Sequence, residues 1–161
     1  MLDKIRQHPA IPENCNPVVA HSKFGSEVGY VHCVCANEVE ENLFLLALEL
    51  DDRHAGAPGR GHGAVSLAML DEVMGRAASR ASKSLCFTAS MTTNFCNGSQ
   101  IGDFLIATAK VRRAGKSFVF VDAELHADEK LIATATGTFA NSGQPIPFSG
   151  KPLENSKSTD I

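Results

Sequence analysis

The residue with the clearest capacity for chemistry is Asp71, an acid inside an apolar helical pattern. The segment 61–83 has the periodicity of a helix. On such a helix, the neighbours of position 71 are all apolar or small, namely Leu67, Ala68, Met74, Gly75 and Ala78. A carboxylate in this setting faces the core or a cleft, where its charge needs partners or a function. Asp71 is therefore a candidate catalytic group, or else a core acid held by backbone or hydroxyl groups.

The next residue, Glu72, has a simpler interpretation. Arg76 follows it by four residues, which is the spacing of an exposed ion pair on a helix. We expect Glu72 to be an ordinary surface residue.

Length and charge limit the class of protein. The chain has 161 residues and a net charge of −3, which indicates one domain and argues against a nucleic-acid-binding or membrane-surface protein. No stretch is long and apolar enough to span a bilayer, and the N-terminus lacks the apolar run of a signal peptide. We expect three parts: an N-terminal extension (1–24), a domain (25–141) and a polar C-terminal tail (142–161).

The cysteines indicate a reducing compartment. The chain has five of them, an odd number at scattered positions, so we expect reduced thiols in a cytoplasmic protein. Cys33 and Cys35 share a strand face, but no second ligand pair at a suitable spacing accompanies them. We expect them to be small buried residues, and we expect no metal site.

The order of elements predicts how the helix is covered. Two strands of about ten residues, joined by a turn at 40–42, precede a Gly- and Pro-containing loop (51–61) and the helix. Four strands follow at 86–97, 103–113, 116–127 and 131–141. One helix cannot cover both faces of such a sheet. We therefore expect an α+β fold, with an antiparallel sheet wrapped around one long helix and a surface left for a partner chain.

Several short motifs together resemble a known family. They are the His-Gly pair 62–63 followed by an acid at 71, Gly102-Asp103, the Arg-x-Gly-Lys turn at 113–116, and Ala-Thr-Ala-Thr-Gly at 133–137. With the order of elements, they resemble the hot-dog fold acyl-CoA thioesterases, most closely the phenylacetate-pathway and hydroxybenzoyl-CoA branch. The resemblance covers about 25–141 and implies a hot-dog fold that hydrolyses acyl-CoA, with coenzyme A as part of the substrate and no separate cofactor.

The resemblance also implies roles for individual residues. In the family, the glycine of the His-Gly pair, here Gly63, polarises the thioester carbonyl through its backbone N–H. The acid eight residues later, here Asp71, is the general base or nucleophile. His62 matches the family histidine, and Thr88 matches a strand hydroxyl that places the water or the acid. This chemistry is physically reasonable, because the first N–H groups of a helix lack partners and lie at its positive end.

Spacing along the helix predicts a site made from two chains. Gly63 and Asp71 are separated by about 12 Å on one helix. A water molecule attacking a thioester cannot comfortably bridge that gap. Antiparallel helices of a symmetric dimer would bring Gly63 of one chain near Asp71 of the other. We expect a homodimer or a dimer-of-dimers tetramer.

One departure from the family pattern concerns the loop before the helix. Many relatives carry Asn six residues before the histidine, where this chain has Gly56. His54 is a possible substitute in contacting the substrate, or else a solvated loop residue. Arg112, Arg113 and Lys116 are candidate ligands of the coenzyme A phosphates, or ordinary solvated residues.

Three functions remain open: thioester hydrolysis, non-catalytic acyl-CoA binding, and hot-dog fold enoyl-CoA hydration or dehydration. The acyl group is not identified by the sequence. Phe87, Phe95 and Met74 are candidate pocket walls and equally good core residues.

Overall fold

The computed structural model describes residues 5, 7–9, 11–13, 15–19, 22–35 and 44–146. A seven-stranded sheet of order β1-β2-β3-β7-β8-β9-β6 dominates it, and every neighbouring pair is antiparallel. The strands are β1 (Cys15–Val19), β2 (Val31–Cys35), β3 (Phe44–Glu49), β6 (Cys86–Phe95), β7 (Phe104–Ala114), β8 (Phe118–Ala127) and β9 (Lys130–Asn141). Strand β6 lies at an edge of this sheet, and the four strands predicted after the helix are confirmed.

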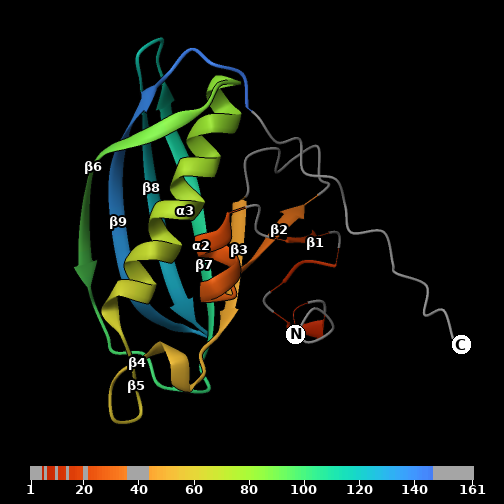
Figure 1. Ribbon diagram of the computed structural model, residues 1–161, viewed down its shortest axis with the longest axis vertical. Coiled ribbons are helices and arrows are strands. Elements are labelled where there is room, and N and C mark those ends of the chain that lie inside the picture. The colour runs from red at the N-terminus through yellow and green to blue at the C-terminus, as the bar shows by residue number, and fades with distance from the viewer. Residues whose placement is uncertain are drawn as a thin grey trace, which may run out of the picture.

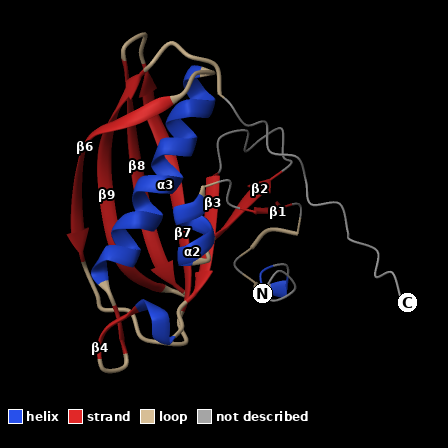
Figure 2. Ribbon diagram, viewed as in Figure 1, coloured by secondary structure: helices blue, strands red, loops and turns tan. Residues whose placement is uncertain are grey.

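One long helix, α3 (Gly63–Ser82), lies across the inner face of the sheet (Figure 1). Its buried face contributes Met69, Leu70, Val73, Met74, Ala77 and Ala78 to the main core. The helix begins at Gly63 because His62 is its N-cap, and it ends where Lys83 adopts a positive φ of 55°. Figure 2 shows the sheet curving around this helix. The α+β hot-dog fold is confirmed.

The outer face of the sheet carries a second, smaller core over β2, β3 and β7. Ile5 and Ile11 are buried there against Val31, Leu45 and Ile106. Strand β1 also adds to the main sheet by pairing with β2. Part of the expected N-terminal extension is therefore built into the fold.

The segment before the helix differs most from its expected structure. In place of two strands of about ten residues, β2 has five and β3 has six. A short helix, α2 (Lys23–Val28), precedes β2 and is capped by the side chain of Ser22. The loop before α3 contains a 3-10 turn, η2 (Asp52–His54), and a small hairpin of β4 (Ala55–Ala57) and β5 (Arg60–Gly61). The turn predicted at 40–42 lies outside the described residues.

The cysteines do not all follow the prediction. Cys15 is disulfide-bonded, so the expectation of reduced thiols, on which the cytoplasmic assignment depended, is wrong for this residue. Cys33, Cys86 and Cys96 are free. Cys33 is buried as predicted, and burial raises the pKa of its thiol to about 11. Among the described residues, no helix is long and apolar enough to cross a membrane.

Candidate active site

The side chains of Asp71 and Thr88 meet between helix α3 and edge strand β6. Thr88 Oγ1 donates a hydrogen bond of 2.6 Å to Asp71 Oδ1. Asp71 is half-buried and Thr88 is exposed, so solvent reaches the pair in the single chain. Because the hydroxyl occupies one carboxylate oxygen, Oδ2 remains available to another group.

The first turn of α3 leaves one backbone donor unused. The Ala64 N–H donates to His62 Nδ1 at 3.0 Å, and the Val65 N–H donates to the His62 carbonyl at 3.0 Å. Within the described part of the chain, no group accepts a hydrogen bond from the N–H of Gly63. This exposed N–H lies at the positive end of the helix dipole, where it can bind an oxygen that carries negative charge.

The same strand, β6, contacts both Gly63 and Asp71. A Cβ atom added to Gly63 would lie 3.4 Å from Phe95 Cε1, so the Phe95 ring packs against the helix start. Phe95 pairs with Ala133, and Thr88 pairs with Phe139. Both partners are fully buried under the helix, and cross-strand partners share a face. A register shift after Thr88 explains how residues seven apart point to the same side.

The other two predicted pocket walls lie elsewhere. Met74 is fully buried in the main core. Phe87 pairs with Ala140 and lies on the outer face of the sheet, away from Thr88. Of the three candidates, only Phe95 is both exposed and on the inner face of the sheet, beside Gly63.

The ring of His62 occupies the space beside Gly56. A Cβ at position 56 would lie 2.8 Å from His62 Cδ2 and 3.0 Å from its Cα. A residue with a side chain, such as the Asn of many relatives, would displace the histidine. Since His62 Nδ1 accepts the Ala64 N–H, the neutral ring carries its proton on Nε2.

The side chain of His54 is engaged outside this site, although its backbone carbonyl accepts the His62 N–H at 2.8 Å. Its side chain is buried, with Nδ1 accepting the Asp51 N–H at 3.0 Å and Nε2 lying 2.7 Å from the Val28 carbonyl oxygen. Because both ring nitrogens have hydrogen-bond partners, the ring links the loop before α3 to Val28 at the end of α2. This geometry favours a structural role over the substrate contact predicted from the loop.

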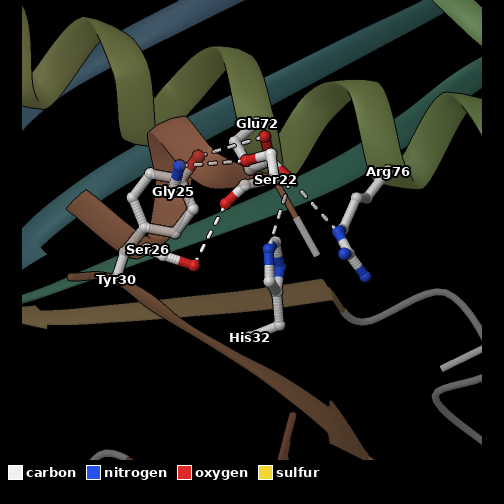
Figure 3. Close-up of polar contacts among 7 residues, drawn as sticks. All are labelled: Ser22, Gly25, Ser26, Tyr30, His32, Glu72 and Arg76. Carbon is white, nitrogen blue, oxygen red and sulfur yellow. Dashed lines mark hydrogen bonds and ion pairs between the residues drawn. The ribbon is translucent and has the colours of Figure 1, made fainter. Parts of the chain in front are cut away.

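Glu72 lies on a different side of α3 from Asp71. It is not the ordinary surface residue that we expected. Its ion pair with Arg76 is present at 3.2 Å, as predicted from their spacing. Its carboxylate also accepts a hydrogen bond from Tyr30 Oη and lies within ion-pair distance of His32 Nε2, each at 3.2 Å (Figure 3). Tyr30 and His32 are buried. No local pattern in the sequence predicts these contacts, because both residues lie about 40 positions before Glu72.

Burial, neighbouring charges and hydrogen bonds together shift the pKa values of Glu72 and Tyr30 in this cluster. Burial alone would raise the pKa of Glu72, but hydrogen bonds and positive charge from His32 and Arg76 outweigh it and lower the pKa to about 2. Burial, followed by the negative charge of Glu72, raises the pKa of Tyr30 to about 12. Glu72 is thus ionised at neutral pH and has a structural role that joins α3 to Tyr30 and His32.

The predicted basic residues lie at the other end of the helix from Gly63. Arg112 is paired with Asp122 at 2.5 Å, whereas Arg113 and Lys116 are exposed and form no ion pair with any described residue. Their turn joins β7 to β8 near the C-terminal end of α3 (Figure 1). A helix of 20 residues is about 30 Å long, so one chain does not bring this turn to its own Gly63.

Comparison with known proteins finds a similarity to one family. Residues 59–133, which include the helix start, Asp71, Thr88 and the β7–β8 turn, match the Thioesterase superfamily. A presumed esterase of Pseudomonas aeruginosa, PA0474, is 28% identical to this chain over 131 residues, covering 80% of the chain and 96% of PA0474.

Solved structures share the fold of this chain. PaaI of E. coli, from the phenylacetic acid degradation operon, has a TM-score of 0.70 and 19% identity, over 78% of this chain and 88% of PaaI. The smu.793 protein of Streptococcus mutans, solved bound to acetyl-CoA, has a TM-score of 0.60 and 21% identity, over 65% of this chain and 85% of that protein.

Proposed function

We propose that this protein hydrolyses an acyl-CoA thioester to a free acid and coenzyme A. The observation that carries the proposal is that two reactive groups lie against the same edge strand, β6. One is the unused Gly63 N–H at the start of α3, and the other is the Asp71 carboxylate held by Thr88. The match of residues 59–133 to the Thioesterase superfamily supports this reaction.

The Gly63 N–H would polarise the thioester. As water adds to the carbonyl carbon, the carbonyl oxygen gains negative charge and accepts a stronger hydrogen bond from this fixed donor. Such a donor contributes about 2.7–4 kcal/mol to transition-state stabilisation. His62 fixes the first turn through its Nδ1, and its Nε2–H remains free to donate to the same oxygen.

Asp71 would activate the attacking water or attack the carbonyl itself. In the first route, Oδ2 takes a proton from the water while its oxygen bonds to the carbonyl carbon. The tetrahedral intermediate then collapses, the carbon–sulfur bond breaks, and the proton passes to the departing thiolate of coenzyme A. In the second route, a carboxylate oxygen bonds to the carbonyl carbon, the carbon–sulfur bond breaks, and coenzyme A departs as its thiolate. Water then hydrolyses the resulting acyl-enzyme anhydride, which releases the free acid and restores the Asp71 carboxylate. Thr88 orients the carboxylate in both routes.

A complete site in this proposal needs two chains. Strand β6 is an exposed edge, and it contacts Asp71 near its start and Gly63 at its end. An antiparallel pairing of β6 with a second copy, with the two-fold axis near Met91 and Thr92, would bring Thr88 of each chain beside Phe95 of its partner. Two equivalent sites would result, each with Asp71 from one chain and Gly63 from the other.

The same arrangement gives the coenzyme A phosphates a place to bind. In the dimer, the β7–β8 turn of one chain would approach the Gly63 end of its partner. Arg113 and Lys116 of that turn are exposed and carry positive charge that no described acid neutralises. The acetyl-CoA bound to the Streptococcus mutans protein supports a coenzyme A substrate. Coenzyme A is part of the substrate, and the proposal includes no separate cofactor.

A panel of acyl-CoA substrates, including acetyl-, butyryl-, benzoyl- and phenylacetyl-CoA, tests the proposal through release of free thiol. We expect turnover of at least one member. Hydration of crotonyl-CoA without thiol release would instead indicate a hydratase. Binding of coenzyme A with no turnover of any member would indicate a non-catalytic binder.

A further inference from the structure

Phe95 is a large aromatic residue left exposed beside the candidate oxyanion donor. Its relative exposure in the single chain is 55%, although it lies on the inner face of the sheet. Its ring packs on the bare backbone of Gly63, where an added Cβ would lie 3.4 Å from Cε1 and 3.5 Å from Cζ. The contact leaves the ring next to the one unused N–H of the first helical turn.

This position limits the space around a bound thioester. A carbonyl oxygen that accepts the Gly63 N–H holds its carbonyl carbon within one bond length. An acyl chain that leaves this carbon on the Phe95 side, with the sulfur of coenzyme A on the other, passes its first carbon close to the ring. An aromatic ring has few rotamers and cannot fold away as a flexible side chain can. A slender CH₂ group fits beside such a wall more easily than a carbon that bears an extra methyl.

We infer that Phe95 is a specificity-determining residue, which excludes acyl groups branched at the carbon next to the thioester carbonyl. The inference rests on the proposed function and deepens it by naming the substrate class, unbranched acyl-CoA. It depends on the contact between Phe95 and Gly63 of one chain, and therefore holds for any dimer register that leaves this contact intact.

The same strand supplies a matched control. Phe87 has a similar relative exposure, 58%, but it points to the outer face, opposite Ala140. Truncation of Phe87 removes as much exposed aromatic surface without changing the space beside Gly63. A change seen with Phe95 and absent with Phe87 thus reports the site and not a general loss of aromatic surface.

The test compares each unbranched substrate with its α-methyl counterpart, butyryl-CoA with 2-methylbutyryl-CoA and phenylacetyl-CoA with 2-phenylpropionyl-CoA. For the wild-type protein, we expect kcat/KM to favour the unbranched member by about tenfold or more, as one misplaced methyl in a pocket can cost that much. Phe95→Ala should reduce this preference by about tenfold, Phe95→Leu should reduce it less, and Phe87→Ala should leave it unchanged.

The outcomes separate the inference from the proposed function. Turnover by the wild type with no preference for unbranched chains overturns the inference and leaves thioester hydrolysis intact. An unchanged preference in folded Phe95→Ala, checked by circular dichroism and light scattering, also overturns it. If that variant does not fold, Phe95→Leu decides by the same ratio. No turnover of any acyl-CoA by the wild type overturns both proposals.

Discussion

Thr88 donates a hydrogen bond of 2.6 Å to Asp71, and this contact joins edge strand β6 to helix α3. It holds the carboxylate against the strand that we propose as the dimer edge. Replacement of Thr88 by Val keeps the shape of the side chain and removes the donor. We expect kcat to fall about 10- to 100-fold, because a hydrogen bond to a charged group contributes about 1.5–3 kcal/mol. Steady-state thiol release measures it.

Two variants control this experiment. Thr88→Ser keeps the hydroxyl and should retain most activity. Thr136→Val removes a hydroxyl from an exposed position of the neighbouring strand β9, away from the proposed dimer edge, and should have no effect. Equal loss in Thr88→Val and Thr136→Val would show that the stability of the sheet, and not the orientation of Asp71, is responsible.

Asp71→Asn tests the acid itself. The amide preserves the size of the side chain and can still accept the Thr88 hydrogen bond, but it can neither take a proton from water nor attack the carbonyl. We expect kcat to fall by about 10²–10⁴ with an unchanged melting temperature. Glu129→Gln, at an exposed acid in the β8–β9 turn, is the control. Near-wild-type kcat in Asp71→Asn would exclude Asp71 as base or nucleophile.

Glu72→Gln should act on stability at acidic pH. The pKa of Glu72 is about 2 in the folded protein, below its ordinary value of 4.5, so the folded state favours the ionised carboxylate. Its contribution, about 2 kcal/mol, is complete above pH 4.5 and disappears as the pH falls toward 2. Urea denaturation between pH 2 and 7 should show a difference from wild type that is largest above pH 4.5.

The control for that series is Glu124→Gln, because the side chain of Glu124 is 59% exposed. Its effect on the free energy of unfolding should stay within about 0.5 kcal/mol. A constant difference between wild type and Glu72→Gln across the whole pH range would contradict the low pKa of Glu72.

Arg113 and Lys116 should affect substrate binding more than chemistry. In the double variant Arg113→Gln/Lys116→Gln, we expect KM for acyl-CoA to rise about three- to tenfold, with kcat changed less than about twofold. The effect should weaken at high salt, which screens exposed charges. The double variant Lys23→Gln/Lys110→Gln, at exposed positions on α2 and β7, removes the same two charges and controls for net charge. Unchanged KM in the double variant would place the phosphates elsewhere.

The sequence predicted best the features that depend on local pattern. The span of α3 follows from its periodicity, and the four strands after it follow from alternation and turn residues. The ion pair between Glu72 and Arg76 follows from their spacing. Predictions failed where distant segments meet. Tyr30 and His32 reach Glu72 only because β2 and α2 fold beside the helix.

The same limit applies to the candidate site. Asp71 could be named from its apolar neighbours on the helix, and Gly63 and Thr88 from the family resemblance. Which of Phe87 and Phe95 lies beside the site depends on a register shift after Thr88, which no local pattern reveals. His54 was a candidate because its loop lies near the helix start, but its contacts to Val28 and Asp51 depend on the folded position of α2.

The central claim, that each site takes Gly63 from one chain and Asp71 from the other, is tested most directly by subunit exchange. Asp71→Asn and Gly63→Val proteins are each expected to be inactive. A mixed dimer would have one site with both lesions and one with neither. After complete exchange of equal amounts, verified by native mass spectrometry, activity should return to about a quarter of the wild-type value. No recovery despite verified exchange would contradict the two-chain site.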